Sequence, residues 1–384
     1  TVNGGIWSTT DGGNKWIPLT DDKSSLSIGS MAYKSGDSNT IFAGIGVTSN
    51  GAFNGNAGIA GRGGPRTGIL VSVNGGKDWS SFADSATSLN GKSVVGVVGR
   101  DDVVVAATAE YNNPSESKDY GLYKSIGGGT FTRVPLPTGA ATSLVGSGTM
   151  ANPYYAAIAG VGIYASDDNG KTWTILSGAG APKLQANQAA RIAVSASGAV
   201  AVAVYNQRDV SLINAGKLEA LYLAPDGTQW RSLPPPIVTT GGQADTDLAI
   251  AIDPKDSNTV YVAGDAQKDG IYLAIYRVTA GPNKSSTTAS LSNDGTSNGT
   301  TSHADARGFA FDASGQLLVA SDGGIYVRTN PQSANGTWSG MNAPTLSLRE
   351  SYGVAYDSVS KRLIVSSQDN GVDIQSCLLY TSPS

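Results

Sequence analysis

The eight residues Ser166-Asp167-Asp168-Asn169-Gly170-Lys171-Thr172-Trp173 carry a pattern, Ser/Thr-x-Asp-x-Gly-x-x-Trp, that returns along the chain. Thr9 to Trp16 repeats it in full, Ser72 to Trp79 has Asn in place of Asp, and 125–131 is a shorter copy ending in Phe. We expect each copy to be a tight hairpin, because Asp or Asn accepts hydrogen bonds from nearby backbone N–H groups, Gly takes a positive φ and Trp fills the core between sheets. The pattern therefore predicts structural roles, not catalytic ones, for Asp11, Trp16, Asn74, Trp79, Asp168 and Trp173.

Size and composition indicate a folded β protein. The 384 residues suffice for one large domain or two ordinary ones, and a hydrophobic content of 40% supports a sizeable core. Charged residues make up 15% of the chain with a net charge of −4, and Lys and Arg are scattered singly, which argues against nucleic acid or an anionic membrane as a partner. The 50 glycines lie beside apolar runs such as Val103 to Ala107 and Ile192 to Val204, as in turns between strands.

Both ends of the chain have unusual features. The first residue is Thr, so we expect a fragment of a larger protein or a chain that has lost a signal peptide. Residues 377–384 lack the Gly-, Asp- and Val-rich composition of the preceding sequence and resemble translated sequencing-adapter read-through. We therefore expect a non-native or unstructured tail. Cys377, the only cysteine, excludes an intrachain disulfide. No stretch approaches the roughly 18 apolar residues of a membrane-spanning helix.

The repeat unit contains four short strands. A Gly-apolar-apolar signature precedes each turn, as in Gly162-Ile163-Tyr164, and a second pair of strands lies upstream, as in 248–253 with 259–264. Four short antiparallel strands per unit are typical of a β-propeller blade. The aromatic residues that close the repeats are separated by 63, 52, 42, 57 and 108 residues, the last interval being two repeats: Trp16, Trp79, Phe131, Trp173, Trp230 and Trp338.

We expect residues 1–376 to form a single all-β propeller. Six units start near Ser30, Ser93, Ala141, Arg191, Asp247 and His303. Residues 352–371 supply an inner half-blade and residues 1–19 an outer half-blade, and their pairing would close a seven-bladed ring and remove free sheet edges. The alternative is two smaller β domains, with 234–236 and 281–302 as linkers.

These residues resemble the Asp-box (BNR) repeat propellers, a group that includes sialidases, xyloglucan-cleaving glycoside hydrolases, sortilin-type receptors and photosystem II assembly factors. The resemblance covers nearly all of 1–376. The stretch from His303 to Asp312, continuing to 321–326, is similar to the His-x-Asp…Asp-Gly-Gly-x-Tyr segment of secreted bacterial members. The resemblance implies a β-propeller and an extracellular or otherwise extracytoplasmic location, but the group spans enzymes, receptors and assembly factors.

The resemblance leaves two functions open. One is a non-catalytic binding or assembly module that holds a protein or glycan partner on one face of the disc. The other is a xyloglucanase-like glycoside hydrolase with an inverting Asp pair. A sialidase is disfavoured, because the Arg-Ile-Pro stretch of that family is missing from the sequence.

If the chain is a hydrolase, we expect its catalytic residues to be acidic residues at the turns between strands of different blades. Its catalytic candidates are Asp322, before Gly-Gly-Ile-Tyr, together with Asp369 and Asp265 or Asp269. Each of these carboxylates has a simpler interpretation, which is a hydrogen bond to the backbone of its own turn.

Candidate ligand contacts come from two long loops and from one inner strand. Arg62 and Arg66 lie in or beside a Gly-rich loop, and Tyr111 with Asn112 lies in the matching loop of the next blade. His303, the only histidine, and Asp305 are expected near the central channel, although His303 could equally be a rim residue bonded to backbone. We predict no cofactor and no His- or Cys-based metal site, while an ion held by Asp and carbonyl oxygens in a blade turn stays open.

Overall fold

The computed structural model describes residues 4–46, 64–109, 119–149, 151–208, 213–267, 272–346, 351–367 and 371–375. Nearly every element within these ranges is an antiparallel strand, and the α-helix found there, α1 (Ser85–Ser88), has four residues. Short 3₁₀ helices occur at η2 (Pro282–Lys284), η3 (Asn293–Gly295) and η4 (Ser297–Gly299). None of the described helices is long and apolar enough to span a bilayer.

Six sheets each contain four strands that follow one another in chain order. The first three are β3 (Ile28–Lys34), β4 (Asp37–Ile45), β5 (Ile69–Ser72) and β6 (Ser80–Ser81); β7 (Val94–Arg100), β8 (Val103–Thr108), β9 (Gly121–Ile126) and β10 (Thr132–Arg133); β11 (Ala141–Gly146), β12 (Tyr154–Ile158), β13 (Gly162–Ser166) and β14 (Thr174–Ile175). The next three are β15 (Gln188–Val194), β16 (Val200–Asn206), β17 (Leu218–Ala224) and β18 (Arg231–Leu233); β19 (Ala249–Asp253), β20 (Asp256–Ala266), β21 (Leu273–Ala280) and β22 (Ser286–Ser290); β23 (Ala306–Phe311), β24 (Leu317–Ser321), β25 (Gly324–Arg328) and β26 (Trp338–Gly340).

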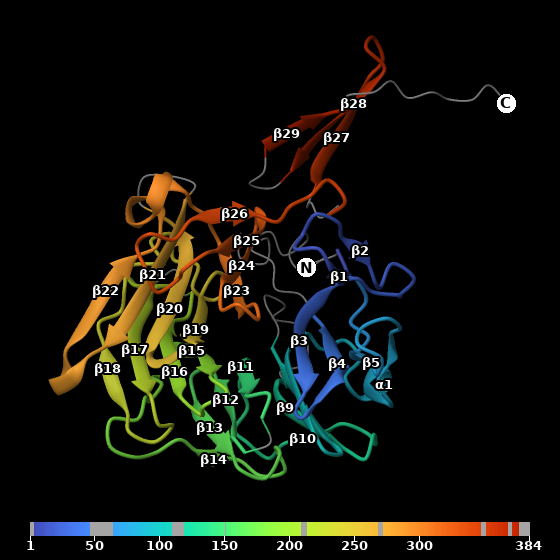
Figure 1. Cartoon of the computed structure of the whole chain (residues 1–384). Coiled ribbons are helices and arrows are strands. Elements are labelled where there is room, and N and C mark those ends of the chain that lie inside the picture. Colours follow the sequence, from blue (N-terminus) through green and yellow to red (C-terminus); the bar gives the residue numbers. More distant parts are fainter. Residues whose placement is uncertain are drawn as a thin grey trace.

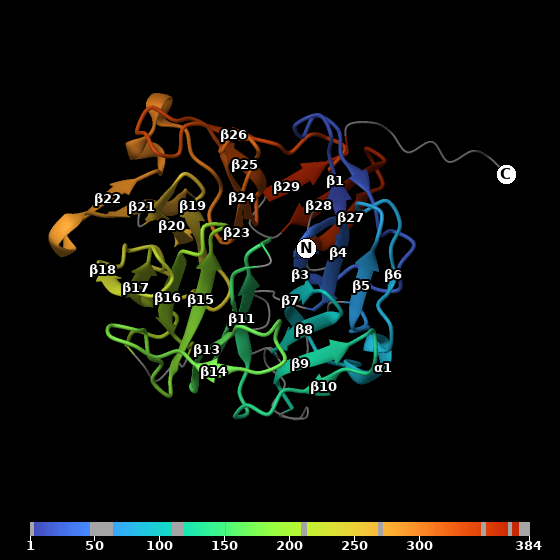
Figure 2. The same ribbon diagram turned by 60° about the horizontal axis from the view of Figure 1, so that its bottom comes forward.

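The six sheets stand around a common axis, with the first strand of each sheet innermost (Figures 1 and 2). Neighbouring first strands contact one another from β3 through β7, β11, β15 and β19 to β23. The first strands begin within three residues of the six unit starts expected from the sequence. The chain is therefore a β-propeller of four-stranded antiparallel blades, as predicted.

The core lies between neighbouring blades. The second strands β8 and β16 are buried along their whole length, because each is covered by a blade on both faces. Trp338, about 4% exposed, belongs to a cluster between the last two of the six blades, whereas Trp79, about 5% exposed, packs with residues of its own blade and with Ile6. The Ser/Thr/Asn/Gly-rich stretch 281–302, considered above as a linker, contributes β22, the fourth strand of its blade.

The expected pairing of the two chain ends is absent from the described residues. β1 (Trp7–Ser8) pairs with β2 (Ile17–Pro18), whereas β27 (Ser351–Asp357), β28 (Arg362–Ser367) and β29 (Gly371–Ile374) form a separate sheet that stands away from the disc (Figure 1). The predicted pairing of 352–371 with 1–19 is wrong at β28, because Val365 of that strand pairs with Val354 of β27 on one side and with Asp373 of β29 on the other.

The N-terminal segment that contains β1 and β2 contacts the residues that follow β26. The Trp16 indole N–H donates to the Met341 carbonyl at 2.8 Å, and the Trp16 backbone N–H donates to Thr345 Oγ1 at 2.9 Å. Trp16 thus joins the N-terminal segment to the residues that follow β26.

Candidate functional site

The repeated turns use their acidic residues internally. Asp168 Oδ1 accepts hydrogen bonds from Ser166 Oγ at 2.9 Å and from the Thr172 N–H at 2.8 Å, while the Gly170 N–H donates to Ser166 Oγ at 2.8 Å. Equivalent bonds occur in the turns of Asp11 and Asn74. These oxygens therefore serve the backbone and hydroxyl groups of their own turns.

An extra residue interrupts the pairing of several inner strands with their neighbours. The register shifts between Ile28 and Ser30, Val94 and Gly96, Ala141 and Ser143, and Ala306 and Gly308. Such a β-bulge re-aims the extra side chain. The four bulge residues all line the central cavity: Gly29, Val95, Thr142 and Arg307. In the blade of β23–β26 the bulge residue is Arg307, so a charged side chain occupies the position that holds Gly, Val or Thr in the other three blades.

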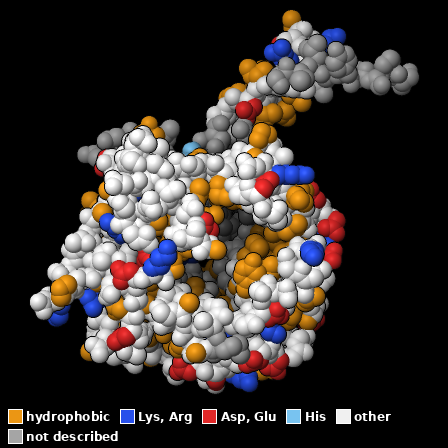
Figure 3. Space-filling model, viewed as in Figure 1, with side chains coloured by type: hydrophobic (Ala, Val, Ile, Leu, Met, Phe, Trp, Pro, Cys, Tyr) orange, Lys and Arg blue, Asp and Glu red, His pale blue; other side chains and the backbone are white. Residues whose placement is uncertain are grey.

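The cavity has a volume of about 480 Å³ and is lined by residues of β3, β7, β11, β15 and β23. Figure 3 shows the hollow at the centre of one face, with hydrophobic side chains beside it. The charged side chains among its lining residues are Arg191 and Arg307. Arg191 is held by two backbone carbonyls, those of Thr142 at 2.6 Å and Asp245 at 2.7 Å.

Arg307 binds two carboxylates. Its Nε and Nη2 atoms donate to Asp322 Oδ1 and Oδ2 at 2.8 and 3.0 Å, and its Nη1 lies 2.6 Å from Asp247 Oδ1. Burial opposes the charged form of Arg307, but Asp247 and Asp322 more than offset that effect and raise its pKa. Bidentate pairing of this kind fixes both partners.

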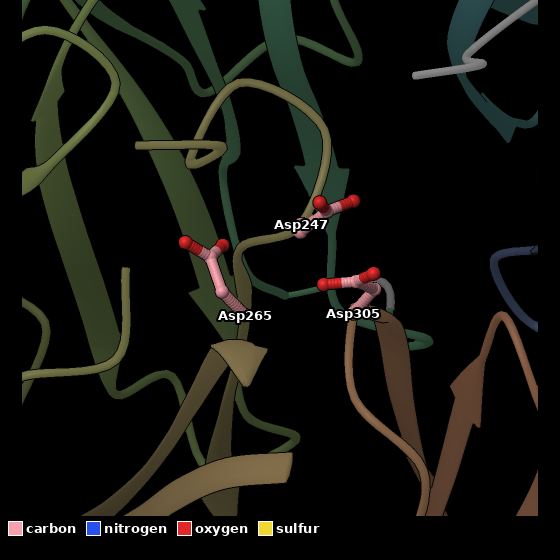
Figure 4. A group of neighbouring side chains, drawn as sticks. All are labelled: Asp247, Asp265 and Asp305. Atoms are coloured by element: carbon pink, nitrogen blue, oxygen red, sulfur yellow. The ribbon is translucent and has the colours of Figure 1, made fainter. Parts of the chain in front are cut away.

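A group of three carboxylates lies beside this ion pair. One oxygen from each of Asp247, Asp265 and Asp305 lies within 4.8 Å of the other two. Figure 4 shows the three side chains arriving from separate segments, with the carboxyl groups of Asp247 and Asp305 one above the other and that of Asp265 beside them. Asp265 lies within the β20 irregularity between Ala263 and Ala266, and Asp305 has a left-handed φ of 64°. We call Asp247, Asp265 and Asp305 the carboxylate triad.

Burial dominates the electrostatics of the triad. It raises the pKa of Asp265 to about 7, although the Gly241 N–H, which donates to Asp265 Oδ2 at 2.7 Å, acts in the opposite direction. Burial also raises the pKa of Asp247 to about 8 despite the nearby Arg307, and the charge of Asp305 adds to the shift in both cases. Asp245, 3.6 Å from Arg208, likewise has a raised pKa because it is buried.

The other predicted site residues have different surroundings. His303 forms an isolated bridge with Tyr272, its Nδ1 lies 3.2 Å from the Ala304 carbonyl, and it packs against Gly323. Arg66 donates to the Gly91 carbonyl at 3.2 Å and does not line the cavity. The remaining candidates lie outside the described residues: Arg62, Tyr111, Asn112, Asp269 and Asp369.

Sequence reasoning named Asp265, Asp305 and Asp322 but missed Asp247 and Arg307. Both missed residues lie at the start of an inner strand, Asp247 before β19 and Arg307 at the bulge of β23. The available signal was Arg307 itself, a cation in a repeat whose equivalent positions hold Gly, Val and Thr.

The fold is similar to that of known enzymes. A GH74 xyloglucanase from Xanthomonas campestris superposes with a TM-score of 0.63 and 16% identity, covering 100% of this chain and 58% of that one. An ancestral GH74 enzyme has a TM-score of 0.62 and 16% identity, with coverage of 97% and 50%. The chain thus spans little more than half the length of these neighbours. No protein-family profile and no curated protein sequence matches the chain.

Proposed function

We propose that this propeller is a non-catalytic binding module of an extracytoplasmic protein, which holds a protein or glycan partner on the face that opens into the central cavity. The observation that carries the proposal is the pairing of Arg307 with both Asp247 and Asp322. An inverting hydrolase needs one carboxylate to activate water and a second to protonate the leaving group, about 6.5–9.5 Å apart. Asp322 is committed to Arg307, and the triad oxygens lie within 4.8 Å of one another, which is too close for that spacing.

The cavity supports binding. Its volume of about 480 Å³ falls within the range of small-ligand sites, and most of its lining residues are glycines and apolar side chains. Met31, which lines the cavity, is 49% exposed and so available to a partner. The two arginines of the lining are held in place by carbonyl and carboxylate oxygens, so the wall is preorganised.

A glycoside hydrolase is the second candidate, and one observation favours it. With its pKa raised to about 7, Asp265 keeps a substantial protonated fraction near neutral pH, as a general acid requires. The structural neighbours named as GH74 enzymes share the fold, and at 16% identity they carry no residue assignment. Its base would have to come from Asp322, after release from Arg307, or from Asp369.

One experiment separates the two functions. The full chain is incubated with xyloglucan and mixed-linkage β-glucan, and reducing ends are counted alongside retention on the same glycans in affinity gels. We expect no new reducing ends. Release that disappears in Asp265→Asn would instead establish the hydrolase. Retention on neither glycan would point to a protein partner.

The cavity face is tested with a pair of matched variants. Met31→Trp introduces bulk at the cavity, whereas Ile126→Trp changes a residue of equal exposure, 48%, on β9 away from it. Once a ligand has been identified, we expect Met31→Trp to weaken its binding and Ile126→Trp to leave its binding unchanged. Equal affinities of the two variants for the ligand would show that the ligand does not bind at the cavity face.

A further inference from the structure

The carboxylate triad gathers negative charge from two blades into a buried space. Asp247 and Asp265 belong to the blade of β19–β22, and Asp305 precedes β23 of the next blade. Asp247 is 0% and Asp265 is 2% exposed. Buried carboxylates at this spacing repel one another and are costly unless a cation or a proton compensates them.

The cations found near the triad among the described residues are shared with other carboxylates. Arg307 pairs with Asp247 but also with Asp322, and Arg208 lies 3.6 Å from Asp245. In the part of the chain that the structure describes, three guanidinium groups, those of Arg191, Arg208 and Arg307, thus lie near five carboxyl groups: Asp245, Asp247, Asp265, Asp305 and Asp322.

Asp265 provides an independent indication of a ligand. Its Oδ2 accepts the Gly241 N–H, whereas its Oδ1 is buried and has no hydrogen-bond partner within the described part of the chain. Figure 4 shows the Asp265 carboxyl group beside those of Asp247 and Asp305. A buried acceptor without a donor is costly, so its retention points to a partner other than the hydrogen-bond donors of the described residues.

We propose that Asp247, Asp265 and Asp305 bind one calcium ion between the two blades, beside the central cavity. Three carboxylate oxygens are ligands for a hard cation such as Ca²⁺, Mg²⁺ or Mn²⁺. Each of the three oxygens lies within 4.8 Å of the other two, so a single cation can approach all three. Ca²⁺ accepts irregular sets of about six to eight oxygen ligands, whereas Mg²⁺ demands near-ideal octahedral geometry and is usually bound by one or two carboxylates, so a site of three carboxylates favours Ca²⁺.

The ion would have a structural consequence that is independent of the partner on the cavity face. It would link the end of β20 to the start of β23, where Arg307 enters the cavity wall. Calcium would thus stabilise the contact between two blades and fix the orientation of this part of the wall.

The test uses the full chain freed of metal by a chelator. Titration calorimetry with CaCl₂ alone is expected to show one ion per chain, with affinity at least about tenfold higher than for MgCl₂. Calcium is also expected to raise the melting temperature, because it binds only the folded state. The absence of both signals, or preferential binding of Mg²⁺, would overturn the calcium assignment.

Two variants and a control locate the ion. Asp265→Asn and Asp305→Asn are each expected to weaken calcium binding by on the order of tenfold or more, and to abolish the calcium-dependent rise in melting temperature. Asp305 is partly exposed, so its variant serves if Asp265→Asn fails to fold. Asp253→Asn is the control, because Asp253 is equally buried but its oxygens bond Tyr261, Lys255 and Gln332. Calcium binding that survives both triad variants would refute the site.

Discussion

Arg307 and Asp322 form a two-bond ion pair across neighbouring strands, from Nε to Oδ1 at 2.8 Å and from Nη2 to Oδ2 at 3.0 Å. The pair exists because a bulge between Ala306 and Gly308 turns the Arg307 side chain toward the turn that follows β24. Arg307 also holds Asp247, so a single guanidinium joins two blades at the cavity wall.

Removing the guanidinium should destabilise the propeller strongly. Arg307→Met keeps much of the side-chain volume but leaves Asp247 and Asp322 without their cation, and breaking such a buried pair costs about 3–5 kcal/mol. We expect a corresponding drop in the urea midpoint, and partial recovery in Arg307→Met/Asp322→Asn. A loss below about 1 kcal/mol would show that the pair is solvated in solution.

The buried acids predict a stability that decreases as the pH rises. Their pKa values in the folded state, about 7 for Asp265 and about 8 for Asp247, exceed the ordinary value of 3.8, so the folded protein binds these protons more tightly than the unfolded chain does. Their contribution to stability is complete below pH 3.8 and is lost progressively as the pH rises to about 8. Carboxyls with lowered pKa, such as Asp168, act in the opposite sense but only near and below 3.8.

We therefore expect the melting temperature of chelator-treated protein to fall by several degrees between pH 5 and pH 8. Asp265→Asn, which cannot ionise, should flatten this dependence. A melting temperature that is constant or rises over the same range in the wild type would contradict the prediction.

Replacing the Asp of a repeated turn by Asn should preserve the stability of the propeller, whereas replacing it by Ala should lower that stability. Asp168→Ala removes the acceptor of the Ser166 hydroxyl and the Thr172 N–H and should cost about 1–2 kcal/mol. Asp168→Asn should cost much less, because Asn74 makes the same bonds in its own turn, accepting from Ser72 Oγ and the Asp78 N–H at 3.0 Å each. Equal unfolding free energies for the two variants would show that these bonds contribute little.

The Trp16 indole should anchor the segment that follows β26. Trp16→Phe removes the hydrogen bond to the Met341 carbonyl, worth about 1 kcal/mol, and should increase protease cleavage within 341–346. Trp79→Phe is the control, because its indole N–H bonds Gly76 within its own turn. Cleavage in this segment that is the same in both variants would contradict an anchoring role for Trp16.

The blades could be predicted from the sequence because the information for each is local. A turn with Asp or Asn, Gly and an aromatic residue sets one hairpin, and the six inner strands begin within three residues of the expected starts. Pairing between the chain ends could not be predicted in this way. It depends on which strand edges are free, and both sides of Val365 are occupied by β27 and β29.

The candidate site likewise combines features that could be predicted from the sequence with features that could not. Single acidic residues at turns, Asp265, Asp305 and Asp322, are visible in the sequence as candidates, and the repeat places them near inner strands. Their environment depends on the tertiary structure, because two bulges and a left-handed residue aim side chains from different blades at one buried space. Local patterns therefore determine which strands and turns form, whereas the burial, ion pairing and pKa of Asp247, Asp265 and Arg307 arise only when distant segments exclude water around them.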